Sequence, residues 1–501
     1  MKHLHAKKSL QVLLEEMAGD NRLKRVLGPF SLTALGVGAI IGTGIFVLVG
    51  KAAHDTTGPA LMLSFVVAGL ACVFAALCYA EFASMAPVAG SAYTYAYTTM
   101  GELWAWIIGW DLVLEYTVAS SAVAHGWSKY FQSLLNSMGI QFPHLFSDAP
   151  FDYSPSLGTF VGTGALFDLP AVFISILITI ILVLGIKEST FFNGIMVLIK
   201  LAVVLLVIIL GIPYVNPENW TPFAPYGYTG VSFFGHTIMG QTGKGGEPLG
   251  MLAGSAIIFF AYIGFDSIST HSEEARNPKR DVPIGIIASL FICTVLYIAV
   301  AAVLTRMVKY NEIDVNAPVS AAFGKVGLPW IQGLVSLGAI AGITSVLLVM
   351  MLSQPRVLLA MARDGLLPKS FFGDVHPKFQ TPWKSTICTG FIVSLASSLL
   401  PLSVLAELVN IGTLLAFVIV CAAVLIMRQT NPEAERPFRC PLVPLVPILG
   451  IGLCLMLMFS LPWQNWARLA GWLGLGMVIY FCYGVHHSVL GKEMRGETVA
   501  K

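Results

Sequence analysis

Long apolar stretches constrain this chain more than any other feature of its sequence. About 20 consecutive apolar residues are enough for an α-helix to cross the hydrocarbon core of a bilayer. Twelve stretches of about this length follow one another along the 501 residues. Only 11% of the residues are charged, whereas about a quarter of the residues in a soluble domain are charged. The sequence therefore predicts an all-α bundle embedded in a membrane.

The twelve predicted spans define the domain organisation. They run over Phe30–Val49, Ala60–Phe82, Leu103–Phe131, Leu169–Ile186, Phe191–Gly211, Met251–Thr270, Val282–Leu304, Pro329–Met361, Ser385–Leu400, Val404–Met427, Pro444–Leu461 and Trp466–His486. We divide the chain into an N-terminal tail (1–29), five spans (30–211), an outside loop (212–250), five spans (251–427), a cytoplasmic loop (428–443), two additional spans (444–488) and a C-terminal tail (489–501). Within the first tail, Lys8–Met17 is expected to form an amphipathic helix or to belong to a disordered basic segment.

Basic residues in the loops predict the orientation. With an even number of spans, both termini lie on one side of the membrane. Of the 29 basic residues, twenty fall in segments on that side and six on the other. Since cytoplasmic loops carry an excess of lysine and arginine, we expect both termini in the cytoplasm.

Several function classes are disfavoured by composition. The net charge is only +2 and no basic stripe is interleaved with aromatic residues, which argues against nucleic-acid binding. The eight cysteines form no CxxC pair and the histidines show no metal-ligand spacing, so we expect neither a disulfide framework nor a bound metal. No nucleophile with its base is evident, and we expect no cofactor and no enzymatic activity.

The first span contains an unusual glycine pattern at Gly42-Thr43-Gly44, about midway across the membrane. Glycine on both sides of a threonine lowers the cost of leaving helical geometry. An unwound stretch at this depth is tolerated where it lines a cavity. The second half-helix would then present backbone N–H groups to an anion such as a carboxylate. The alternative is close helix packing through small residues, and the residues alone do not separate the two.

The sixth span is interrupted at Gly264, in the position that corresponds to the first span if the chain is divided into two groups of five. Paired interruptions are typical of inverted repeats, in which substrate binds between the two broken helices near the midplane. The sequence thus favours a transport site at the breaks of spans one and six.

Three ionisable residues lie deep within the spans. Asp111 and Glu115 are one helical turn apart on span three. Lys200 lies ten residues into span five, about 15 Å from the inner face. Charged groups at such depth face a cavity or pair with one another. We therefore expect either a proton-linked or amine-binding cluster or a structural ion pair.

Five segments resemble those of the amino acid–polyamine–organocation transporters, and within them the cationic amino acid transporter group. The match covers nearly the whole chain, and the segments that carry it are Gly38–Phe46, Ala76–Tyr95, Phe259–Pro283, Pro355–Pro368 and Leu405–Phe417. The resemblance implies a LeuT-like fold, in which two inverted repeats of five spans are followed by two additional helices. The animal members have fourteen spans, so the twelve predicted here are nearer to the bacterial set and imply a location in the bacterial plasma membrane.

The resemblance also implies where the substrate carboxylate binds. In such transporters it meets backbone amides of the broken first helix, which match Gly42, Thr43 and Gly44 here. Glu115 matches an acidic position near the substrate side chain, which would suit a cationic amino acid, although a carboxylate there also admits neutral ones.

The substrate ammonium group is expected to meet backbone carbonyls on both broken helices. The matching positions are Ile40 on span one and Phe260, Ala261 and Ile263 on span six. Phe260 would also serve as an aromatic lid.

Coupling to protons is implied by Lys200, which matches a lysine found in proton-coupled relatives where sodium-coupled ones bind a sodium ion. Burial penalises the charged form of an amine, so such a lysine can gain and lose a proton. We therefore expect a permease that imports cationic or small neutral L-amino acids with protons, by alternating access across the lipid bilayer. The alternatives are an amino acid exchanger and an amino acid sensor without net transport.

Overall fold

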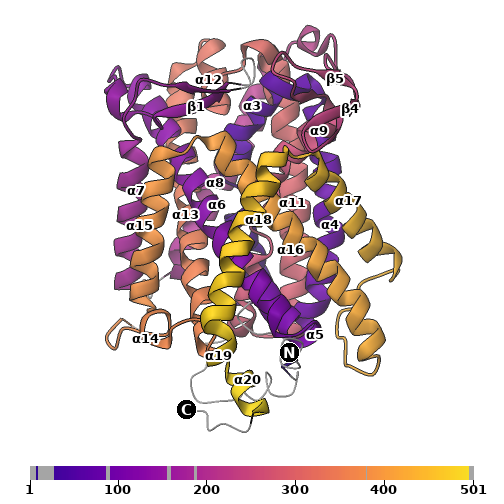
Figure 1. The fold of residues 1–501 in the computed structure, drawn as a ribbon. Coiled ribbons are helices and arrows are strands. Elements are labelled where there is room, and N and C mark those ends of the chain that lie inside the picture. Colours follow the sequence, from indigo (N-terminus) through magenta and orange to yellow (C-terminus); the bar gives the residue numbers. More distant parts are fainter. Residues whose placement is uncertain are drawn as a thin grey trace.

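The computed structural model describes residues 7–8, 27–85, 91–154, 159–185, 189–379 and 381–495. Most of the predicted N-terminal tail, including the expected helix after Lys8, lies outside these residues, as does the end of the C-terminal tail. The described part is a bundle of helices with short β-hairpins at one end and α20 at the other (Figure 1). We call these the hairpin end and the α20 end.

The α-helices are mostly long and follow the order of the predicted spans. Their bounds are α2 (Pro29–Ile40), α3 (Val49–Ala52), α4 (Leu61–Met85), α5 (Ser91–Thr99), α6 (Glu102–Ser137), α7 (Leu169–Leu184), α8 (Ser189–Gly211), α9 (Met251–Ile258), α10 (Ser267–Thr270), α11 (Pro278–Met307), α12 (Pro318–Lys325), α13 (Pro329–Arg363), α14 (Lys369–Phe372), α15 (Trp383–Leu399), α16 (Leu402–Thr430), α17 (Leu445–Ser460), α18 (Trp463–Ile479), α19 (Val485–His487) and α20 (Val489–Met494).

Three antiparallel hairpins lie in the loops of the hairpin end (Figure 1). They pair β1 (Phe151–Ser154) with β2 (Thr159–Gly162), β3 (Val231–Phe233) with β4 (His236–Met239), and β5 (Gln241–Thr242) with β6 (Pro248–Leu249). The last two belong to the loop predicted over 212–250, which is therefore partly structured.

Eight helical segments among the described residues are long and apolar enough to cross a membrane. They are Gly44–Met85, Glu102–Ser137, Gly194–Tyr214, Met251–Thr270, Pro278–Met307, Pro329–Arg363, Leu402–Thr430 and Trp463–His487. Shorter apolar helices cover Pro29–Ile40, Leu169–Leu184 and Leu445–Ser460. Each predicted span falls on helical residues, which confirms the mostly helical membrane protein, while the number of crossings stays a prediction.

Close packing at small residues holds the bundle together. α13 packs along α6 and α8, and α11 packs along α4 and α2. A Cβ on Gly338 would lie 2.1 Å from Val203, and one on Gly390 would lie 2.0 Å from Thr179. Membrane helices associate through such close approaches, because lipid tails provide no hydrophobic drive for them to do so. The packing sets α2 against α8, α11 and α13, and α9 against α4, α16 and α17.

Candidate functional site

The first span is broken where its glycine pattern predicts. α2 ends at Ile40, and Ile41 has extended backbone angles (φ −73°, ψ 99°). The helix resumes at Thr43 and continues as a π-helical turn over Gly44–Leu48. The predicted break is therefore confirmed. It lies about one residue nearer to the start of the span than Gly42-Thr43-Gly44. The first N–H groups of the second half-helix have no acceptor within that half-helix, so they can receive an anion.

The sixth span is broken as well. α9 is followed by a 3₁₀ turn over Phe259–Tyr262, and Ile263 is extended (ψ 135°). Gly264 has φ +120°, which side-chain-bearing residues rarely adopt, and a Cβ there would lie 2.8 Å from the carbonyl oxygen of Ala39. The chain then turns into α10. The interruption predicted at Gly264 is thus confirmed, and the backbone conformation explains why glycine occupies it.

The two breaks touch each other. A Cβ on Gly44 would lie only 2.3 Å from the Cα of Ala261, so the backbones approach as closely as glycine permits. Gly44 therefore serves both alternatives considered for the glycine pattern: it begins the second half-helix and it packs tightly against the neighbouring span.

Tyr297 of α11 joins the breaks by a hydrogen bond. Its fully buried hydroxyl lies 2.8 Å from the carbonyl oxygens of both Ile40 and Ala261 and shares its one proton between them. These are two of the carbonyls predicted to receive the substrate ammonium group, so the structure brings them to one point. Sequence reasoning missed Tyr297, because a single tyrosine in an apolar span has no distinguishing pattern.

We expect Tyr297→Phe to weaken substrate binding, raising the KM for uptake about tenfold. The two carbonyls would lose the hydroxyl that aligns them, and an unsatisfied buried acceptor costs about 1–3 kcal/mol. Tyr480→Phe is the matched control, because it removes a buried tyrosine hydroxyl that donates to Glu102 at the α20 end. Equal KM values for the two variants would contradict a role of Tyr297 at the breaks.

The other predicted ammonium acceptors differ in their surroundings. The Phe260 carbonyl accepts a hydrogen bond from the Ile263 amide at 3.2 Å. The side chains of Phe260 and Ile263 are buried, with exposed fractions of 5% and 4%. Ile263 follows the turn in extended conformation. The Phe260 carbonyl is therefore less available than those of Ile40 and Ala261.

Lys200 lies against the first break. Its ammonium group is fully buried and donates to the carbonyl oxygens of Gly38 at 2.6 Å and Ile41 at 3.1 Å. The last carbonyls of a helix lack intrahelical donors and form its negative end, so a cation is stabilised there. Among the residues that the structure describes, Lys200 forms no ion pair with Asp111 or Glu115. The alternative of an ion pair between span five and span three is therefore wrong.

Thr43 lies at the start of the second half-helix, on the predicted carboxylate site. It is buried, and its hydroxyl oxygen has no hydrogen-bond partner within the described chain. Its Cγ2 faces Gly126 of α6, where a Cβ would lie 2.3 Å away. Val346 of α13 packs against Gly42. The residues beside the break are thus small or apolar, and the Thr43 hydroxyl is the polar group among them.

Asp111 and Glu115 form a separate layer on the α20 side of the breaks. Glu115 precedes Gly126 by eleven residues on α6, about 16 Å along the helix axis. Both carboxylates are 1% exposed and have no hydrogen-bond partner within the described residues. Nearby Asp266 accepts a hydrogen bond from Tyr116 at 3.1 Å. The structure therefore does not place Glu115 beside Thr43, but in an acidic layer that borders the second break.

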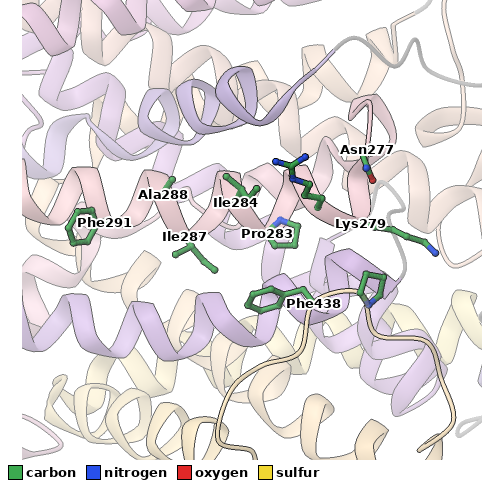
Figure 2. A pocket seen from close by; sticks show the side chains of 10 residues that line it. Asn277, Lys279, Pro283, Ile284, Ile287, Ala288, Phe291 and Phe438 are labelled. Atoms are coloured by element: carbon green, nitrogen blue, oxygen red, sulfur yellow. The ribbon is translucent and has the colours of Figure 1, made fainter.

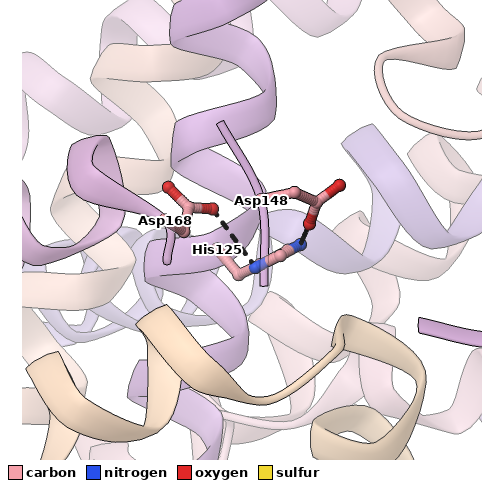
Figure 3. A group of neighbouring side chains, drawn as sticks. All are labelled: His125, Asp148 and Asp168. Carbon is pink, nitrogen blue, oxygen red and sulfur yellow. Dashed lines mark ion pairs between the residues drawn. The ribbon is translucent and has the colours of Figure 1, made fainter. Parts of the chain in front are cut away.

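A further polar cluster lies toward the hairpin end, built from His125 of α6 and two loop aspartates (Figure 3). Nδ1 of His125 lies 3.3 Å from Asp168 and Nε2 lies 3.6 Å from Asp148. Asp168 also caps α7 by accepting from the Ala171 amide, and burial raises the pKa of Asp168 to about 7. Lys129 pairs with Asp148 at 2.5 Å.

In this cluster the His125 ring is held between two aspartates. The two carboxylates lie at opposite nitrogens of one imidazole ring (Figure 3). One ligand atom from each of the three residues lies within 4.8 Å of the other two, which is close enough to hold a cation, and Lys129 already pairs with Asp148. The contacts join α6, the start of α7 and the loop between them. No ligand spacing in the sequence points to this group, since its members are far apart along the chain.

Comparison with known proteins agrees with the broken-helix site. Residues 27–481 match the amino acid permease family. The chain is 48% identical over 487 residues to the branched-chain amino acid permease BcaP of Bacillus subtilis, covering 97% of this chain and 98% of the relative. It is 46% identical over 492 residues to the methylthioribose transporter of the same bacterium, covering 98% and 100%.

More distant similarity extends to plants. The vacuolar cationic amino acid transporter 4 of Arabidopsis thaliana is 38% identical over 416 residues, which cover 83% of this chain and 65% of the relative. The relatives are transporters rather than enzymes, and the names of two of the three support amino acid transport. The chain belongs to the amino acid permease family, within the amino acid–polyamine–organocation superfamily that its motifs resemble.

Proposed function

We propose that this permease imports L-amino acids together with protons. The observation that carries the proposal is the hydrogen bonding of the Lys200 ammonium group to the Gly38 and Ile41 carbonyls. A titratable group thereby acts directly on the backbone at the first break. Loss of its proton removes the positive charge that stabilises the end of α2, so protonation and the position of the half-helix are linked.

The substrate would bind between the two breaks. Its carboxylate would accept from the amides of Gly42, Thr43 and Gly44, and the Thr43 hydroxyl supplies a further donor. Its ammonium group would donate to the remaining lone pairs of the Ile40 and Ala261 carbonyls, which the Tyr297 hydroxyl already aligns. An amino acid presents these two charges at a fixed separation, and the site offers one half-helix end and one carbonyl pair to match them.

The site residues are closed to solvent in this conformation. The exposed fractions of Ile40, Thr43 and Ala261 are 3%, 1% and 1%. Substrate can reach them only if the bundle opens on one side at a time, as alternating access requires. Broken helices supply the hinge, because Ile41 and Gly264 already depart from helical geometry.

For the side chain, we propose a neutral aliphatic amino acid as the preferred substrate. Gly126 and Val346 leave small, apolar walls near the first break. The 48% identical relative is named for branched-chain amino acids. A cationic side chain would have to point toward the α20 side, to the layer of Glu115 that borders the second break, and away from Gly126. The 46% identical methylthioribose transporter makes that thiosugar the second candidate.

The proposed membrane arrangement has twelve spans in two inverted groups of five and one group of two, in a bacterial plasma membrane. The paired breaks support the repeat, and the eight long and three shorter apolar helical segments, of which Gly44–Met85 overlaps two predicted spans, support the count. Exposed basic residues at the α20 end, such as Lys279, Arg280 and Lys369, support a cytoplasmic location for that end and for both termini.

Purified protein in liposomes tests the function. We expect labelled leucine or isoleucine to accumulate in empty vesicles under an inward proton gradient, and a protonophore to abolish accumulation. Uptake confined to vesicles preloaded with amino acid would identify an exchanger instead. No movement in either case, with binding retained, would identify a sensor. Competition by excess arginine, alanine or methylthioribose then ranks the substrate classes.

A further inference from the structure

A groove of about 760 Å³ opens on the surface of α11 near the α20 end. One wall is the outward face of α11, and the other is the loop segment Pro437–Phe438. Figure 2 shows Pro283, Ile284, Ile287, Ala288 and Phe291 following one another along the helix, with Phe438 opposite and Lys279 at one end. The groove lies away from the broken helices and has no part in the site described above.

The outward-facing side chains of α11 that line the groove are apolar, and we call this strip the lane. Ile284, Ile287, Ala288 and Phe291 repeat at helical spacing on one face. Ile284, Ile287 and Phe291 have exposed fractions of 39%, 37% and 69%. The opposite face of α11 is buried against α2, where Gly285 meets Leu32 and Ser289 meets Gly36. The lane therefore faces the hydrocarbon core of the membrane, where acyl chains are the solvent.

The end of the groove is cationic. Lys279 and Arg280 lie in the first turn of α11 and are exposed. Lys279 pairs with Glu435 at 3.0 Å, but both side chains are largely exposed (53% and 78%), and such pairs contribute little. The Arg280 guanidinium has no hydrogen-bond or ion-pair partner within the described chain, and only its backbone amide donates, to the Asn277 carbonyl. A guanidinium is well suited to phosphate, since it can donate two parallel hydrogen bonds.

The distance from the cationic end of the groove to the far end of its apolar side matches the length of one phospholipid in a leaflet. From Arg280 to Phe291 is eleven residues, or about 16 Å along the helix. One leaflet of the hydrocarbon core is about 15 Å thick. A phosphate held at Arg280 would therefore have its acyl chain ending near Phe291.

We propose that this groove binds an anionic phospholipid from the leaflet at the α20 end. The phosphate contacts Lys279 and Arg280, and one acyl chain lies along Ile284, Ile287 and Phe291 beneath Phe438. Charge complementarity selects an anionic headgroup, and the apolar lane requires an attached chain. The bound lipid fills the space between α11 and the loop, and so holds the loop against the helix whose other face carries Tyr297 toward the breaks. The proposal does not depend on which substrate or ion the protein transports.

The thermal stability of the purified protein tests the headgroup contact. Phosphatidylglycerol is expected to raise the Tm of the wild type by about 3 °C more than phosphatidylcholine with the same chains. In K279Q/R280Q this difference disappears. In the control K369Q/K378Q, which removes two exposed basic residues at the same end, it remains. Equal stabilisation by the two lipids, or a difference that survives in K279Q/R280Q, overturns the proposal.

Two further measurements test the rest of the groove. Glu435→Gln frees Lys279, so the number of phosphatidylglycerol molecules retained in native mass spectra is expected to rise, while Ala288→Trp fills the lane and is expected to lower it. Both variants are first checked for wild-type Tm without lipid. Full stabilisation by glycerol 1-phosphate, which has no acyl chain, would reduce the groove to an anion site and contradict the lipid assignment.

Discussion

Replacing Lys200 by methionine is expected to abolish accumulation driven by an inward proton gradient, lowering it about tenfold or more, while amino acid exchange between loaded vesicles continues. Methionine has a similar length but no proton to exchange, so the Gly38 and Ile41 carbonyls lose a cationic donor in every step of the cycle. Uptake into empty vesicles and exchange into loaded ones are measured side by side. The difference between the two assays isolates coupling from binding.

The matched variants for this prediction are Lys200→Arg and Lys309→Met. Arginine keeps a permanent positive charge, because a guanidinium does not lose its proton in proteins. Proton-driven accumulation is therefore expected to fail in Lys200→Arg as well, although the charge remains. Lys309 is exposed after the end of α11, and its replacement is expected to leave both assays unchanged. Undiminished accumulation by Lys200→Met would show that the proton is carried elsewhere.

Two features of the site could be predicted because each is locally unusual. Gly42 and Gly44 flank a threonine in the middle of an apolar run, and Gly264 interrupts another. A lone lysine far from either end of a span stands out in the same way. The energetic cost of each feature in a membrane is high, so its presence implies a compensating structure. The breaks and the burial of Lys200 follow from this reasoning.

The partners of these residues could not be predicted, because they depend on distant contacts. Lys200 bonds to backbone carbonyls, which every residue has, so no side-chain pattern identifies them. The depth estimate along single helices suggested the carboxylates of Asp111 and Glu115 instead. Depth alone does not say which faces meet. The same limit applies to His125, which meets aspartates from two other parts of the chain.

Helix lengths were underestimated for a different reason. The apolar pattern predicts Leu103–Phe131, but α6 continues to Ser137. Its last turns contain polar residues, which end the hydrophobic signal without ending the helix. The hairpins of the 212–250 loop were missed because strands of two to four residues carry too little periodicity. Hydropathy therefore locates the membrane-buried part of a helix and not its full extent.

Gly44→Ala is expected to lower uptake about 100-fold, the second large effect. The new methyl group would lie 2.3 Å from the Cα and 2.6 Å from the Cβ of Ala261, and backbone cannot yield as the end of a flexible side chain does. The two breaks must therefore separate. Overpacking of this kind costs about 1–3 kcal/mol, and a displacement of about 1 Å at a site that aligns two charges costs far more in function than in stability.

The comparison that tests this argument is Gly452→Ala in α17, where a Cβ meets nothing within 4 Å. That variant makes the same chemical change in a membrane helix and is expected to transport normally, with an equal or higher Tm. Ala261→Gly added to Gly44→Ala is expected to restore little, because the Cα of residue 261 remains in the way. Recovery of uptake in the double variant would show that side-chain volume, rather than the approach of the two backbones, limits the site. Normal uptake by Gly44→Ala alone would mean that the breaks do not form a rigid pair around the substrate.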